Sequence, residues 1–126
     1  MTRYLLIGFF GLTGIFARYF VNSLVVNTLS FGFPVATLGI NILGSLLIGL
    51  AYAGGSTVIS DDMRIALMSG LLGGFTTFSA FSLDSVSLFT SGRYFLGSVY
   101  LLGSVGGSLV ATVLGIYIGK QVFGLS

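Results

Sequence analysis

The sequence predicts an all-α integral membrane protein with four transmembrane helices. The chain has 126 residues, of which 55% are hydrophobic and only 6% are charged, and its mean hydropathy is +1.08. A soluble domain carries roughly 25% charged residues, so this chain could not cover a water-facing surface. Apolar runs of about 20 residues can each cross a bilayer as a helix. We expect a single four-helix membrane domain over residues 1–126, with helices at about 4–26, 34–53, 63–89 and 94–122.

The residue types that are missing narrow the function. The chain has no cysteine and no histidine, which excludes disulfides and thiolate metal sites and removes the usual base of hydrolytic triads. Its net charge of +2 comes from five cations and three anions, so the basic balance reflects scarce charge. We therefore expect no hydrolytic triad of the usual kind and no nucleic-acid-binding patch.

The first expected helix, residues 4–26, combines a small-residue ridge with one buried cation. Gly8, Gly11 and Gly14 are spaced by three and predict close contact with another helix. Arg18 interrupts the run before a signal-peptide cleavage site could follow, so we interpret the run as a membrane span. A cation at this depth either snorkels to the surface or provides positive potential at an anion vestibule.

The second expected helix carries three polar side chains on one face. Pro34 suits its first turn, and Thr37, Asn41 and Ser45 follow at a spacing of four. The Asn41 amide has two N–H donors and an acceptor that need partners inside the membrane. It either joins helices together or lines a pore.

The loop between the second and third helices is expected at residues 54–62. Asp61 and Asp62 close this loop, and we expect them to cap the N-terminus of the third helix, where a negative charge is favourable.

The third expected helix contains residues that loosen helical structure near its middle. Gly73 and Gly74 lack side chains, and the hydroxyls of Thr76 and Thr77 compete for backbone partners. A freed carbonyl is costly in lipid unless protein, water or an ion satisfies it. The stretch therefore predicts either a mid-membrane break that builds an ion site or a packing surface of small residues.

Beyond these residues, Phe78, Phe81 and Asp84 recur every three positions on one face. A carboxylate inside a membrane span is a candidate for function, although Asp84 could equally pair with an arginine.

The fourth expected helix presents one stripe of hydroxyl groups. Tyr100, Ser104, Ser108 and Thr112 recur at a strict spacing of four, which covers about 18 Å of helix. Small residues alone would predict helix packing, but the ring of Tyr100 would keep backbones apart. The stripe is therefore also a candidate path.

The candidate inward-facing groups are almost all neutral hydrogen-bond donors. A cation path needs carbonyls or carboxylates in series, and a proton-coupled transporter usually has paired ionisable residues. A line of donors, joined by rings with positive edges, suits a small anion.

The stretch from Gly70 to Ser82, GLLGGFTTFSAFS, resembles the GxxGGxTTFSTF signature of the Fluc/CrcB fluoride channels. It departs from that signature at Ala80, where a threonine or serine is common. The signature is long and unusual in composition, so the resemblance is specific.

The other helices resemble the same family. The first carries the family's G-x-x-G-x-x-x-R-Y pattern from Gly11 to Tyr19, and the second carries its N-x-x-G pattern at Asn41 and Gly44. The fourth carries a comparable Tyr-Ser-Ser polar track. The resemblance thus covers nearly the whole chain.

The resemblance implies a fluoride-selective channel that exports fluoride passively and confers fluoride resistance. It implies an antiparallel, dual-topology homodimer in the plasma or inner membrane, with two pores and one structural sodium ion (Na⁺) at the dimer interface. The ligands of that ion would be the backbone carbonyls of Gly73 and Thr76. The implied fluoride pathway is Asn41, Phe78, Phe81, Tyr100, Ser104 and Ser108, and the implied vestibule or supporting residues are Arg18, Thr37, Thr77, Ser79, Asp84 and Thr112.

Two alternatives use the same four spans. A small multidrug-resistance-like exporter would rely on a glutamate in the first helix, and this chain contains no glutamate. A non-transporting subunit would not need the hydroxyl stripe. Cations near the helix ends number three on the side of the termini (Arg3, Arg64 and Lys120) against one, Arg93, on the other. This count mildly favours termini inside the cell, so the expectation of dual topology comes from the resemblance.

Overall fold

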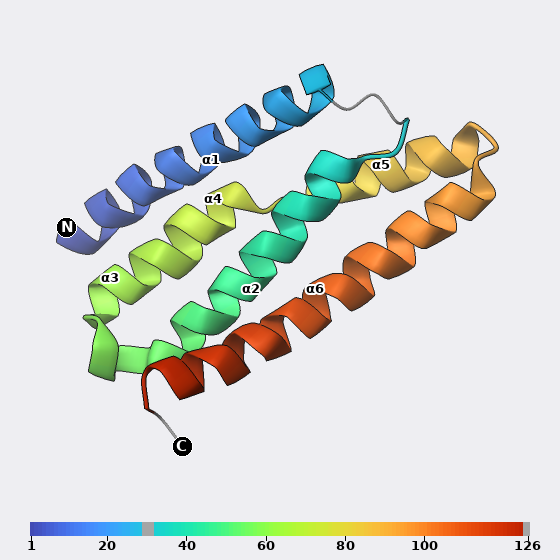
Figure 1. Cartoon of the computed structure of the whole chain (residues 1–126). Helices are drawn as coiled ribbons and strands as arrows, with labels where there is room; N and C mark the ends of the chain where they lie inside the picture. The colour runs from blue at the N-terminus through green and yellow to red at the C-terminus, as the bar shows by residue number, and fades with distance from the viewer. Residues whose placement is uncertain (29–31, 125–126) are drawn as a thin grey trace.

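The computed structural model of the chain describes residues 1–28 and 32–124, which form helices and no strands. The elements are α1 (Thr2–Thr28), α2 (Val35–Val58), α3 (Asp61–Ile65), the π-helix η1 (Ala66–Leu72), α4 (Gly73–Phe75), α5 (Phe78–Thr90) and α6 (Tyr94–Val122) (Figure 1). Within the described residues, four segments are long and apolar enough to cross a membrane: α1, α2, the succession from α3 to α5, and α6. The prediction of an all-helical protein with four spans is confirmed.

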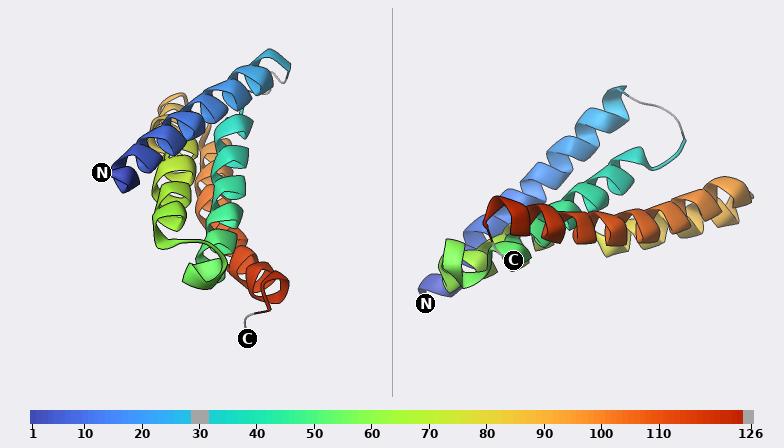
Figure 2. Two further views of the ribbon diagram at one scale, coloured as in Figure 1. Left: turned by 90° about the vertical axis from the view of Figure 1, so that its left-hand side faces the viewer. Right: turned by 60° about the horizontal axis from the view of Figure 1, so that its bottom comes forward.

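The four spans run side by side, and the N-terminus and the end of α6 lie at the same end of the molecule (Figure 1). The closest pairing is between α2 and α6, whereas α1 lies mainly against η1 and α4. In the described residues α1 has no close contact with α5 or α6, and Figure 2 shows it leaning away from them at its far end. The face around Phe16, Tyr19 and Phe20 is exposed.

Glycines allow the close approach of α2 and α6. A Cβ atom added at Gly115 would collide with the carbonyl oxygen of Leu46, and one at Gly49 would collide with the carbonyl oxygen of Thr112. A Cβ atom at Gly119 would lie 2.6 Å from the Cβ atom of Ala53. The two backbones therefore touch along a seam that larger residues could not occupy.

A second glycine contact joins α1 to the third span. A Cβ atom at Gly14 would collide with the carbonyl oxygen of Leu71, and one at Gly74 would lie 2.6 Å from the carbonyl oxygen of Gly11. The predicted ridge is confirmed for Gly11 and Gly14. It is wrong for Gly8, because nothing lies within 4 Å of a Cβ atom built there.

The second connection is shorter than predicted. Helix α2 continues to Val58, although Gly55 has φ 55° and ψ −162° and bends the chain inside the expected loop. A positive φ of this size is readily adopted by glycine, so the expected loop is a kinked helix end.

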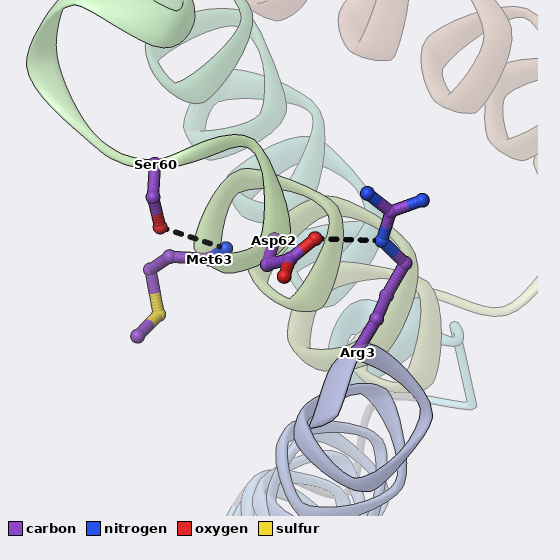
Figure 3. Close-up of polar contacts among 4 residues, drawn as sticks. All are labelled: Arg3, Ser60, Asp62 and Met63. Atoms are coloured by element: carbon purple, nitrogen blue, oxygen red, sulfur yellow. Dashed lines mark hydrogen bonds and ion pairs between the residues drawn. The ribbon is translucent and has the colours of Figure 1, made fainter. Parts of the chain in front are cut away.

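The expectation that Asp61 and Asp62 cap the third span is wrong. Ser60 is the N-cap, and its hydroxyl oxygen accepts a hydrogen bond of 3.3 Å from the N–H of Met63 (Figure 3). The two aspartates occupy the first turn, where a carboxylate still favours the positive end of the helix dipole. Asp62 also pairs with Arg3 of α1, with 2.7 Å between Oδ1 and Nε.

The third span changes conformation twice. Its first half passes from α3 into η1, where the N–H of Gly73 reaches the carbonyl of Met68 five residues back. Its second half begins at Phe78, after Thr76 and Thr77 adopt extended backbone angles of φ −81°, ψ 158° and φ −150°, ψ 114°. The α-helical hydrogen-bond ladder is therefore interrupted between α4 and α5.

Candidate functional site

A cavity of about 360 Å³ lies where α2 and α6 face the interrupted third span. Polar and apolar residues of α2 and α6 line it, together with residues at and just before the interruption and two phenylalanine rings. The lining residues are Asn41, Gly44, Ser45, Ile48, Leu72, Gly73, Thr76, Thr77, Phe78, Phe81, Ser104, Val105, Ser108 and Leu109.

Asn41 of α2 is hydrogen-bonded to the backbone of the interruption. Its Nδ2 donates to the carbonyl of Thr77 at 3.0 Å, and its Oδ1 accepts from the N–H of Thr77 at 2.8 Å. Asn41 thus joins α2 to the third span, and the same residue lines the cavity. Its place in a pore stays a prediction.

The interruption diverts the backbone donors of the third span. In a continuous α-helix the N–H of Thr77 would bond to the carbonyl of Gly73, and the N–H of Ala80 to that of Thr76. Here Thr77 donates to Asn41, and Ala80 donates to the Thr77 hydroxyl at 3.2 Å. The carbonyls of Gly73 and Thr76 therefore lack their regular helical partners.

The side chains of Thr76 and Thr77 shape the two helix ends beside the interruption. The Thr76 hydroxyl donates to the carbonyl of Leu72 at 2.9 Å, which closes the last turn before the interruption. Thr77 is the N-cap of α5, and its hydroxyl also lies 3.2 Å from that of Ser79. Ser79 is exposed and lies outside the cavity lining.

The serine and threonine hydroxyls of the α6 stripe fall into two groups. Ser104 and Ser108 line the cavity, and the buried Ser104 hydroxyl has no hydrogen-bond partner among the described residues. Thr112 instead donates to the carbonyls of Ser45 and Ser108, each at 3.1 Å, which holds α2 and α6 together. Ser104 thus places a buried hydroxyl without a partner beside the cavity.

Tyr100 lies behind the cavity wall, where it is fully buried. Its ring packs between Phe81 and Phe33, with centroid distances of 5.5 and 5.6 Å. Its hydroxyl donates to Oδ2 of Asp84 at 3.1 Å, and Thr37 of α2 is likewise buried. Within the described residues, no arginine forms an ion pair with Asp84. Its hydrogen-bond partner is Tyr100.

Phe78 and Phe81 form the aromatic part of the cavity wall. Their ring centroids are 5.4 Å apart at 55°, but their exposure differs greatly: Phe78 is 78% exposed and Phe81 only 8%. Arg18 lies on α1, half-buried and outside the lining. The cavity thus gathers Asn41, Gly73, Thr76, Thr77, both rings, Ser104 and Ser108, but not the remaining candidates.

Ser45 and Gly44 contribute to the site beyond the predicted set. Ser45 shares the polar face of Asn41, and the spacing of four is the signal that could have included it. A Cβ atom at Gly44 would collide with the Thr76 methyl group, so glycine lets the interruption approach α2. The apolar lining from Ile48, Val105 and Leu109 carries no signal in the sequence that separates it from lipid-facing residues.

The four apolar spans, and the cavity between them with polar side chains in its lining, define a multi-pass membrane protein with a candidate ion site at an interrupted helix. Residues 5–116 match the family model described as "CrcB-like protein, Camphor Resistance (CrcB)". The chain belongs to this CrcB family.

Curated relatives cover nearly the full length. A protein of Ruminiclostridium cellulolyticum is 41% identical over 124 residues, which are 97% of this chain and 95% of the relative. Proteins of Geobacter sulfurreducens and Chlorobium luteolum are 40% and 42% identical, over 97% and 92% of this chain and 100% and 91% of their own lengths. All three relatives are named "Fluoride-specific ion channel FluC".

Proposed function

We propose that this protein is a fluoride-selective ion channel that exports fluoride passively and thereby gives fluoride resistance. The names of the relatives support this function. The observation that carries it is the cavity wall: of the described residues, only neutral side chains line it, and the buried Ser104 hydroxyl has no partner. The protein is a membrane channel and not an enzyme.

The chemistry of the wall suits a small anion. An anion that leaves water needs hydrogen-bond donors to replace its hydration shell, and the wall offers Asn41, Ser104 and Ser108. The rings of Phe78 and Phe81 can contribute the positive edges of their quadrupoles. A proton-coupled or cation-exchanging site would instead place ionisable side chains in the cavity.

The proposed channel is an antiparallel homodimer with one pore on each side and a structural sodium ion between the subunits. A two-fold axis in the membrane plane would bring two interruptions together if each lies at mid-membrane. The carbonyls of Gly73 and Thr76, which lack their helical donors, would then supply four oxygens. Such oxygens suit a hard cation. Bound there, the ion would neutralise the carbonyl dipoles and hold the subunits together.

Ion selectivity tests the proposed function. Purified protein reconstituted into liposomes loaded with KF or KCl should release fluoride at channel rates, measured with ion-selective electrodes. Chloride release should match that of empty vesicles. Equal release of both anions would contradict fluoride selectivity, and proton-coupled uptake of a cationic drug would support the exporter alternative instead.

Labelling from outside tests the antiparallel arrangement. Because the chain has no native cysteine, a single cysteine added after Ser126 is a unique label site. An impermeant thiol reagent applied to intact cells should label about half of the molecules, with the rest labelled only after permeabilisation. Labelling of nearly all copies from one side would reject the antiparallel dimer.

A further inference from the structure

We propose that Asn41 builds the cation site and couples it to the anion path, because its side chain keeps the Gly73 carbonyl free while it lines the cavity. This inference rests on the sodium site of the proposed function. It makes Asn41 a positioning residue for the cation, in addition to a donor to the anion.

The Asn41 amide matches an extended residue and not a helical one. Thr77 has φ −150° and ψ 114°, and in such a residue the N–H and C=O point to the same side. One primary amide can then pair with both groups, as a neighbouring strand would, and Asn41 does so at 3.0 and 2.8 Å. The pair therefore stabilises the extended conformation of Thr77 specifically.

The hydrogen bond from the Thr77 N–H to Asn41 also keeps this donor away from the Gly73 carbonyl. Without Asn41, the N–H of Thr77 would be a buried donor with no partner, and the nearest remedy is the helical bond to Gly73. Re-forming that bond would occupy the Gly73 oxygen and remove one proposed ligand from each subunit. The Thr77 hydroxyl protects the Thr76 carbonyl in the same way by binding the N–H of Ala80.

The amide also faces the proposed anion path. One N–H of Nδ2 donates to Thr77, and the other makes no hydrogen bond within the described residues. Asn41 lines the same cavity as Ser104, Ser108 and Phe78. A single side chain thus contacts both the segment that presents the cation ligands and the space that would hold the anion.

Sodium-dependent stability separates these roles from ion flux. The thermal unfolding temperature of detergent-purified protein is titrated with sodium gluconate, with N-methylglucamine gluconate keeping ionic strength constant. The wild-type protein should be stabilised by Na⁺. Asn41→Leu, which keeps the branching at Cγ but removes both hydrogen bonds, should raise the half-maximal Na⁺ concentration by about tenfold or more.

Two further variants complete the test. Ser85→Ala is the matched control. Within the described residues the buried Ser85 hydroxyl bonds only to the carbonyl of Phe81 in its own helix, and Ser85 itself does not line the cavity. The Na⁺ response of this variant should equal that of the wild type. Asn41→Asp keeps an acceptor for the Thr77 N–H but places a negative charge in the cavity. It should keep the Na⁺ response and lose fluoride flux.

The outcomes distinguish the two proposals. A wild-type protein with fluoride flux but no response to Na⁺ would overturn the sodium site itself. A wild-type response with an unchanged midpoint in Asn41→Leu would overturn the role of Asn41 alone. If Asn41→Leu is not recovered folded, the same titration of Asn41→Ser, whose side chain is too short to bridge to Thr77, decides in the same way.

Discussion

The α2–α6 pair and the span from α3 to α5 provide hydrogen-bond partners for their backbone groups in different ways. In the interior of a membrane, water is not there to provide these partners. Within its α-helical stretch, the α2–α6 pair does so inside each helix and uses Gly49 and Gly115 only to bring the backbones together. The α3–α5 span gives up regular helical bonds at Thr76 and Thr77 and replaces them with side chains of α2 and of its own N-cap.

This difference separates packing from function. The seam between α2 and α6 requires small side chains, so a substitution there is harmful when the new side chain is too large. The interruption requires specific hydrogen-bond donors and acceptors, so a substitution there can be harmful even when the side chain keeps its size. Mutations that change volume and mutations that change hydrogen bonding should therefore have separable effects on the two regions.

Enlarging the seam should have the largest effect. Gly115→Leu would drive a side chain into the carbonyl of Leu46 and should destabilise the protein by about 3 kcal/mol. Thermal unfolding in detergent measures the loss. Gly106→Leu on the same helix is the control, because nothing lies within 4 Å of its added Cβ atom. Equal destabilisation by both variants would contradict the close approach of the α2 and α6 backbones at Gly115.

Changing an exposed ring of the cavity should come next and should affect flux only. Phe78→Ile is expected to lower fluoride flux by about tenfold, or about 1.4 kcal/mol of barrier, with unfolding unchanged. Phe95 is equally exposed, at 79%, and does not line the cavity, so Phe95→Ile should leave flux unaltered. Normal flux in Phe78→Ile would mean that this ring does not contact the ion.

Removing the cap of α5 should cost about 1 kcal/mol of stability. Thr77→Val keeps the side-chain shape but loses the hydroxyl that accepts from Ala80. Hydrogen exchange should be faster in the first turn of α5 than in the wild type. Thr90→Val is the matched control, since among the described residues the Thr90 hydroxyl bonds only to carbonyls in the last turns of α5. Similar losses in both variants would contradict a special role for the cap.

Breaking the terminal ion pair should have the smallest effect. Arg3 and Asp62 are about half exposed, with 51% and 44% of their side chains accessible, so water competes for both charges. Arg3→Gln and Asp62→Asn should each shift the unfolding temperature only slightly, and added salt should remove the difference. A large shift that persists in high salt would show that the pair holds α1 in place.

The sequence predicts the spans better than their contacts. Length and hydropathy define four spans because a bilayer demands about 20 apolar residues from each. The glycine spacing on α1 predicts a contact face but not its extent, since Gly8 has the same pattern as Gly11 and no neighbour. A mid-membrane position for the interruption, and the dimer that depends on it, stay predictions.

Hydrogen-bond partners on different helices of the site are harder to predict from the sequence. The polar faces of α2 and α6 follow from helical spacing, and both supply residues to one cavity. Spacing does not say that Tyr100 turns away from that cavity toward Asp84, or that Thr112 bonds to the backbone of Ser45. Those partners depend on how two helices are rotated against each other, which no local pattern encodes.

The π-helix η1 has a consequence for insertions and deletions. A turn closed by a bond five residues back contains one residue more than an α-helical turn. Deleting one residue in an α-helix rotates everything beyond it by about 100°. Deleting the exposed Ser69 should instead convert the π-turn to an α-turn and leave both flanking faces in place. Helix α6 contains no π-turn, so a deletion of Val105 should rotate Ser108 and Thr112 away from the face that they share with Ser104. Among the described helices, η1 is thus the place where the span from α3 to α5 can lose one residue without rotating the segments on either side.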